Sequence, residues 1–224
     1  MSQTTGTASA PKTACADTAF ITKLGLEGAE PALVHVDMAP ANLIEASVER
    51  HEGTLTSTGS IAVTTGEYTG RAPQNRFIVD TPNVHDRIAW GKVNAPMATE
   101  NFDRIYEGVR AYLSERDTYV VRGMAGADRA HSRNFAVVCE KPHQALFARQ
   151  MLVRPAAEEL ASYEPDFVVL AAPDYRCNPE TDGTATESVV AINFERRIII
   201  VAGTGYSGEI KKSIFSTMNY LLPV

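Results

Sequence analysis

The sequence contains seven short runs of apolar and β-branched residues, several of them apolar at nearly every position. A strand with one solvent-exposed face alternates apolar and polar residues, whereas a strand covered on both faces is continuously apolar. The runs are therefore predicted to be strands of a sheet that is covered on both sides. In chain order they are SIAVTT, RFIVD, TYVVRGM, NFAVVCE, DFVVLAAP, SVVAINF and RRIIIVA.

Helical periodicity lies between and around these runs. It is clearest from Thr99 to Arg116, where six apolar residues share one face and Thr99 is the candidate N-cap. PANLIEASVERHEG and HQALFARQML predict two further helices, and another begins at about Glu209. SVVAINF and RRIIIVA are almost contiguous and are predicted to form a tight hairpin. Because strands and helices do not alternate regularly, the pattern favours an α/β or α+β domain, and we predict an α/β fold with a mixed sheet flanked by helices.

Composition limits the partners. The formal net charge is −6 and the isoelectric point is near 5.4, so the chain as a whole has no general attraction to nucleic acid or anionic membranes. No apolar run approaches the ~20 residues that span a bilayer. We therefore expect no nucleic-acid partner and no membrane partner, and any anion site must be built locally.

The ends of the chain and its cysteines suggest a compartment. The three cysteines are far apart and form no C-x-x-C pair, which argues against a structural zinc site and fits a reducing environment. The N-terminus is polar and has no apolar export segment. The sequence predicts a cytoplasmic protein with a flexible tail at residues 1–15 and one domain at 16–224.

One glycine-rich stretch, GTGYSGEIKK, follows a predicted strand and opens a predicted helix. A dinucleotide fingerprint needs a second strand that the sixteen residues after Gly208 cannot supply, and a P-loop needs lysine where Glu209 stands. Lys211 and Lys212 lie in the first turn, where the helix dipole disfavours cations. Two lysines beside free backbone N–H groups predict a site for a carboxylate or phosphate. Surface lysines behind a tight turn are the alternative.

A second glycine-rich stretch, TTGEYTGRAPQNRFIVD, carries Arg71 between Gly70 and the rigid exit at Pro73. A guanidinium is a planar fork that can clamp a carboxylate through two parallel hydrogen bonds. Taken alone, an arginine in such a loop is more often a surface residue.

Together the two stretches resemble the ATP-dependent phosphoenolpyruvate carboxykinases. TGEYTGRAP is similar to that family's T-G-x-x-T-G-R-S-P loop, and GTGYSGEIKKSIF is similar to its G-T-x-Y-[AG]-G-E-[IM]-K-K-x-[IMF]-F motif. Other segments agree in order, and the resemblance extends from Pro31 to Pro223. They are IAWGKVNAPMATENFDRIY, GADRAHSRNFAVVCE, ALFARQMLVRP, DGTATESVVAINFERRIII and MNYLLP.

The resemblance implies an activity and roles for particular residues. Such enzymes convert oxaloacetate and ATP to phosphoenolpyruvate, CO2 and ADP in gluconeogenesis, with Mg²⁺ on the nucleotide and a second ion, often Mn²⁺. Arg71 would bind the substrate carboxylate, and Tyr206 would pack near the same carboxylate. Lys211 would lie near the substrate and the transferring phosphoryl group, and Lys212 would be a neutral ligand to Mn²⁺.

The sequence departs from the family's pattern at several positions and in its extent. The family's C-terminal domain, with the P-loop, the His and Asp metal ligands and a second substrate arginine, is absent from this chain. We therefore expect half an active site, no turnover and no tight cofactor binding by the chain alone. The alternatives are a non-catalytic oxaloacetate or phosphoenolpyruvate-binding module and a split subunit that needs a separate nucleotide-binding chain. The local departures are Ala72 for Ser, PQNR for Pro-Lys-Asp-Lys, Gly205 for a bulkier residue, Ser207 as a small-residue variation, His143 for Trp and Arg122 for Asp.

Overall fold

The computed structural model describes residues 18–26 and 33–222. The predicted flexible tail, residues 1–15, lies outside the described residues. The helices are α1 (Thr18–Lys23), α2 (Pro40–Glu49), α3 (Pro82–His85), α4 (Thr99–Ser114), α5 (Pro142–Met151), α6 (Ala157–Ala161), α7 (Pro179–Asp182) and α8 (Gly208–Leu221), with a 3-10 turn at Pro73–Asn75. The strands are β1 (Val34–Val36), β2 (Gly53–Leu55), β3 (Ile61–Val63), β4 (Arg76–Val79), β5 (Ala95–Met97), β6 (Thr118–Ala125), β7 (Arg133–Cys139), β8 (Phe167–Ala172), β9 (Val189–Asn193) and β10 (Ile198–Ala202).

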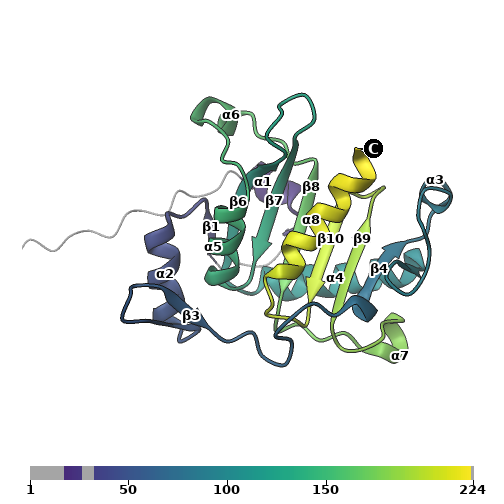
Figure 1. Ribbon diagram of the computed structural model, residues 1–224, viewed down its shortest axis with the longest axis horizontal. Helices are drawn as coiled ribbons and strands as arrows, with labels where there is room; N and C mark the ends of the chain where they lie inside the picture. The colour runs from purple at the N-terminus through teal and green to yellow at the C-terminus, as the bar shows by residue number, and fades with distance from the viewer. Residues whose placement is uncertain (1–17, 27–32, 223–224) are drawn as a thin grey trace, which may run out of the picture.

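One large mixed sheet organises the molecule (Figure 1). Its eight strands follow the order β1-β6-β7-β8-β10-β9-β4-β5. The pairs β6–β7 and β9–β10 are antiparallel, and the other neighbours run parallel. The α/β fold with a mixed sheet flanked by helices is confirmed, and so is the hairpin of the last two strands.

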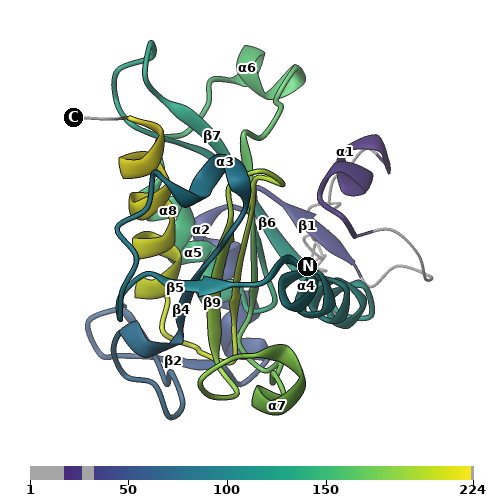
Figure 2. The ribbon, with the colours of Figure 1, turned by 90° about the vertical axis from the view of Figure 1, so that its right-hand side faces the viewer.

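Helices cover the sheet on both faces. Figure 2, which views the sheet nearly edge-on, shows α8 and α5 on one side and α4 and α1 on the other. Each face has its own apolar cluster. The cluster under α5 and α8 contains Phe135, Ile199 and Ile210, and the cluster under α4 contains Phe102 and Leu170. This double cover explains why the strands are continuously apolar.

All seven predicted strands are present, and one lies outside the large sheet. SIAVTT contributes β3, which pairs with β2 in a separate two-stranded antiparallel sheet. Three strands were not predicted, β1, β2 and β5, and each has only three residues. β5 contains Pro96, a residue that edge strands tolerate because it lacks the ladder N–H donor. Such short segments carry too little periodicity to be found in sequence.

The four predicted helices are present with small shifts at their ends. The prediction of Thr99 as an N-cap is wrong by one residue: Ala98 holds the extended N-cap position, without a side-chain hydrogen bond, and Thr99 is the first helical residue. The reason lies in the sheet, because β5 ends at Met97 and fixes where the chain can turn into the helix. In the part of the chain that the structure describes, no helix combines the length and apolarity needed to cross a membrane.

Candidate functional site

The two stretches that carry the predicted site lie at the same end of the sheet, one leading into β4 and the other following β10. Arg76, at the start of β4, pairs with Val190 of β9, and Val190 pairs with Val201 near the end of β10. The start of β4 and the end of β10 therefore lie at the same end of the sheet, on either side of β9. Residues 64–72, before the turn into β4, are called the arginine loop here, and residues 203–207, after β10, are called the glycine loop.

The glycine loop is held tightly and requires its glycines. Gly203 has a φ of 73°, and a Cβ there would lie 2.6 Å from the carbonyl oxygen of Glu187. Arg176 donates from Nη1 to the carbonyl oxygen of Gly203 at 2.7 Å. A Cβ on Gly208 would collide with the ring of Tyr206, so this ring lies directly against the start of α8. At Gly203 the positive φ and the backbone contact both require glycine, whereas a side chain at Gly208 would have to displace the ring of Tyr206.

The arginine loop and the glycine loop are in contact. A Cβ on Gly205 would lie 3.0 Å from the carbonyl oxygen of Thr65, so a side chain there would crowd the backbone of the arginine loop. The hydroxyl of Tyr68 lies 3.2 Å from Oγ1 of Thr186, which ties the arginine loop to the segment before β9. The two loops therefore form one structural unit at this end of the sheet.

A cleft of about 380 Å³ lies beside this unit, between the start of β4 and the exposed side of α8. Four basic side chains line it: Arg71, Arg76, Arg87 and Lys212. Among the described residues that line the cleft, none is an aspartate or a glutamate. A concave surface with this positive charge concentrates anions. Because the net charge of the whole chain is negative, the cleft differs in sign from the rest of the molecule.

Packing fixes the positions of the basic groups. Arg87 donates from Nη1 to the hydroxyl of Tyr220 at 2.9 Å, and its guanidinium carbon lies 4.1 Å from the centre of that ring. Nζ of Lys212 lies 5.0 Å from the centre of the Phe215 ring. Arg76 is half-buried, and burial followed by repulsion from Arg71 lowers the pKa of its guanidinium. Cations crowded in this way favour an anionic ligand between them.

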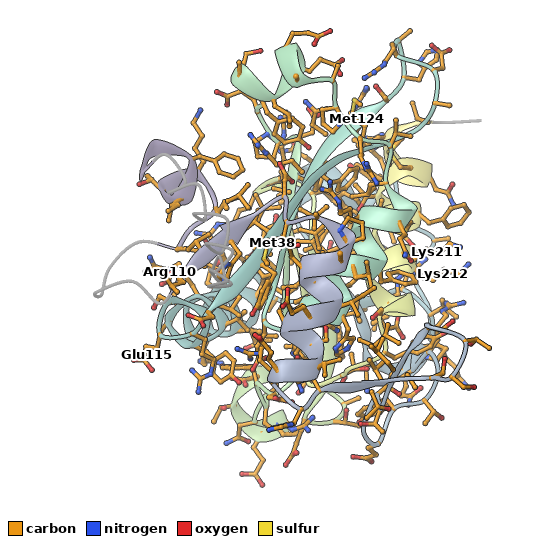
Figure 3. All side chains as sticks on the ribbon, turned by 90° about the vertical axis from the view of Figure 1, so that its left-hand side faces the viewer. Met38, Arg110, Glu115, Met124, Lys211 and Lys212 are labelled. Carbon is orange, nitrogen blue, oxygen red and sulfur yellow. The ribbon has the colours of Figure 1, made fainter. Side chains whose placement is uncertain are left out.

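The structure brings together some of the predicted site residues. Arg71 and Lys212 line the same cleft, although they are 141 positions apart in the sequence. Lys211, next to Lys212 near the beginning of α8, is exposed and does not line this cleft (Figure 3). Tyr206 is half-buried against Gly208 rather than in the cleft. The roles that the resemblance implies for these residues remain predictions.

Arg76 and Arg87 are the basic residues that sequence reasoning missed. Arg76 is the first residue of a predicted strand, five positions after Arg71, and this position could have suggested a role. Arg87 lies in an irregular segment between α3 and β5, and its sequence context carries no glycine pattern or helical period. Its position in the cleft follows only from the contact with Tyr220 at the other end of α8.

The described residues do not form a complete metal site. No group of three or more His, Cys, Asp or Glu side chains in residues 18–26 and 33–222 is placed to hold an ion. Lys212 faces Phe215, and a single amine beside an aromatic ring is an incomplete donor set for Mn²⁺ or Mg²⁺.

The fold and the cleft together define a class, namely an α/β domain with a basic cleft that has no carboxylate among its described lining residues and that lies beside two glycine-containing loops. Comparison with known families gives a more precise result. A family model described as phosphoenolpyruvate carboxykinase matches residues 32–224. The chain belongs to the ATP-dependent phosphoenolpyruvate carboxykinase family.

Individual relatives agree with the family. The chain is 48% identical over 193 residues to phosphoenolpyruvate carboxykinase (ATP) 1 of Moorella thermoacetica, which covers 86% of this chain and 37% of that protein. It is 48% identical over 191 residues to phosphoenolpyruvate carboxykinase (ATP) of Geobacillus kaustophilus, and the match covers 85% of this chain and 36% of that protein. It is 43% identical over 189 residues to phosphoenolpyruvate carboxykinase (ATP) of Bacillus cereus, and the match covers 84% of this chain and 36% of that protein. The chain spans a little over a third of the length of these relatives.

Proposed function

We propose that this chain is the substrate-side, N-terminal domain of an ATP-dependent phosphoenolpyruvate carboxykinase, and that its cleft binds oxaloacetate and phosphoenolpyruvate. The observation that carries the proposal is the cleft in which Arg71 and Lys212 meet two further arginines and no carboxylate. Both ligands are small anions with a carboxylate, which a guanidinium can hold through two parallel hydrogen bonds.

The charge of the cleft also suits the chemistry of the family. Loss of CO2 from oxaloacetate leaves an enolate, and fixed cations stabilise such a charge most effectively where water is excluded. The following phosphoryl transfer depends on positioning and on electrostatic stabilisation. In this proposal Arg71 binds the substrate carboxylate and Lys212 faces the reacting groups in the cleft. Tyr206, near the carboxylate, and Lys211, near the transferring phosphoryl group, do not line the cleft of this chain and would reach the ligand only in the complete enzyme.

Catalysis is proposed for the complete enzyme, not for this chain alone. ATP, Mg²⁺ and Mn²⁺ would bind together with a C-terminal domain, which we propose as the partner of this one, in a cytoplasmic gluconeogenic enzyme. Lys212 would contribute one ligand to Mn²⁺ only in that assembly. A non-catalytic binding module and a split subunit are the alternatives. Substantial turnover of oxaloacetate by the isolated chain with ATP, Mg²⁺ and Mn²⁺ would contradict the proposal of a substrate-side half.

Calorimetric titration of phosphoenolpyruvate into the chain tests the binding site. We expect Arg71→Ala to weaken binding by at least about tenfold, because a charge-assisted hydrogen bond contributes about 1.5–3 kcal/mol. The matched control is Arg110→Ala, an arginine on α4 that Figure 3 shows on the opposite side of the molecule from the lysine pair. Equal affinities of the Arg71→Ala and wild-type chains would overturn the proposed site.

A further inference from the structure

Glu209, at the beginning of α8, has a buried carboxylate whose position calls for an explanation. The residue is only 5% exposed. Burial of a carboxylate is costly unless hydrogen bonds or opposite charges compensate for it. Its Oε1 accepts a hydrogen bond from the backbone N–H of Ala72 at 2.9 Å. This hydrogen bond joins two residues that are 137 positions apart.

The donor of this hydrogen bond is the peptide directly after Arg71. On the other side of Ala72, Pro73 restricts the backbone and opens the 3-10 turn into β4. The carboxylate therefore fixes the arginine loop at the residue adjoining the arginine. Glu209 and Lys212 are three residues apart on α8 and so lie on neighbouring positions of one helix face. The helix face that carries Lys212 into the cleft thus also holds the backbone of Arg71.

The charge of Glu209 acts in the same place. The carboxylate opposes the effect of burial and of Arg71 on the guanidinium of Arg76. It does not itself line the cleft. Glu209 can therefore offset repulsion between the two arginines without presenting a negative charge to an anionic ligand.

We propose that Glu209 is a positioning residue for Arg71: its buried carboxylate holds the arginine loop against the start of α8, so that Arg71 and Lys212 face one ligand. The part of this inference that concerns a ligand rests on the proposed binding of phosphoenolpyruvate. The part that concerns the loop stands on the hydrogen bond to Ala72 and can be tested without any ligand.

Two conservative substitutions separate the reach of the side chain from its charge. Glu209→Gln keeps an oxygen at the same distance along the side chain and removes the charge. Glu209→Asp keeps the charge and shortens the side chain by one methylene, so the carboxylate no longer reaches the N–H of Ala72. Hydrogen exchange at the Ala72 amide, measured in the free chain, reports directly on the contact.

We expect the Ala72 amide to be protected in the wild type and in Glu209→Gln and to exchange rapidly in Glu209→Asp, with the strands still protected. Phosphoenolpyruvate affinity should fall about tenfold in Glu209→Asp. The same substitution in an Arg71→Ala background should cause no further loss, because Glu209 acts through Arg71. A general defect in folding would instead weaken binding equally in both backgrounds.

Two results would overturn the inference. One is unchanged protection of Ala72 in Glu209→Asp. The other is an equal loss of affinity with and without Arg71. If the wild-type chain fails to bind phosphoenolpyruvate, the proposed function fails, and the exchange of Ala72 still decides whether Glu209 holds the loop.

Discussion

At the scale of single residues, His143 is a buried histidine whose surroundings disfavour the charged ring. The residue is 6% exposed, and neither ring nitrogen has a hydrogen-bond partner among the described residues. Nδ1 lies 4.0 Å from a carboxylate oxygen of Glu52, too far for a hydrogen bond. Burial, followed by repulsion from Lys141 and opposed by Asp174, lowers the pKa of His143 to about 4.

His143 should therefore make folding stability depend on pH. The imidazole of the unfolded chain takes up a proton near pH 6.5, before the folded one does. The free energy of unfolding should fall as the pH is lowered from about 6.5 to about 4, by up to about 3 kcal/mol. Urea unfolding at pH 7 and pH 4.5 measures the difference.

The comparison variant is His143→Phe, in which an apolar ring replaces the imidazole and leaves no partner unpaired. Its stability should fall less with pH than that of the wild type. His131→Phe, at an exposed position, controls for the loss of one surface imidazole. Parallel pH dependences of the wild type and His143→Phe would refute the interpretation.

At the scale of elements, the candidate site depends on two loops that pack backbone against backbone. Gly205 makes this possible, because a Cβ there would lie 3.0 Å from the carbonyl oxygen of Thr65 and 3.1 Å from its Cα. Backbone atoms in a loop held at both ends cannot shift as a flexible side chain does. A larger residue at this position should separate the arginine loop from the glycine loop.

Gly205→Ala should accordingly weaken phosphoenolpyruvate binding several-fold, while the free energy of unfolding falls by about 1–3 kcal/mol, as in other overpacked sites. Calorimetry and urea unfolding measure the two effects. Gly91→Ala is the matched control, since a Cβ on Gly91 meets nothing within 4 Å. Wild-type affinity in Gly205→Ala would show that the loop contact does not shape the cleft.

At the scale of the whole molecule, the sheet joins two apolar clusters into one unit. Neighbouring residues of a single strand, such as Val137 and Val138, belong to the clusters on opposite faces. Trp90 packs against the cluster under α5 and α8, whereas Phe102 of α4 is fully buried in the other. A substitution that destabilises the cluster on one face should therefore also lower the stability of the cluster on the other face.

Phe102→Ala should lower the free energy of unfolding by about 3–5 kcal/mol. Because the two faces share their strands, fluorescence of Trp90, the single tryptophan of the chain, should still report the same transition as far-UV circular dichroism. Separate midpoints for the two signals in this variant would mean that the faces unfold independently. The conservative Val109→Ala, on the same helix face, should give a smaller loss and coincident signals.

The elements that could be predicted from sequence are those whose signal is local and long enough. RRIIIVA is a continuous apolar run and the helix from Thr99 has a clear helical period. Arg71 and Lys212 were singled out by short glycine-containing motifs and by the family resemblance, and their roles remain predictions. The strands β1, β2 and β5 were missed because three residues carry too little periodicity, and for β1 and β5 the pairing partner is distant in the chain, as Ala95–Met97 shows beside β4. Arg87 was missed because its place in the cleft depends on a contact with Tyr220, 133 positions away in the chain.

The sequence by itself determined the covered sheet, its flanking helices and the residues able to bind an anion, because hydrophobic period and side-chain chemistry are properties of short segments. Only the tertiary structure decided which of those residues share a cleft. The register of β4, β9 and β10 brings Arg71 to Lys212. The hydrogen bond from Ala72 to Glu209 fixes them there, and no local pattern encodes a contact between residues so far apart in the chain.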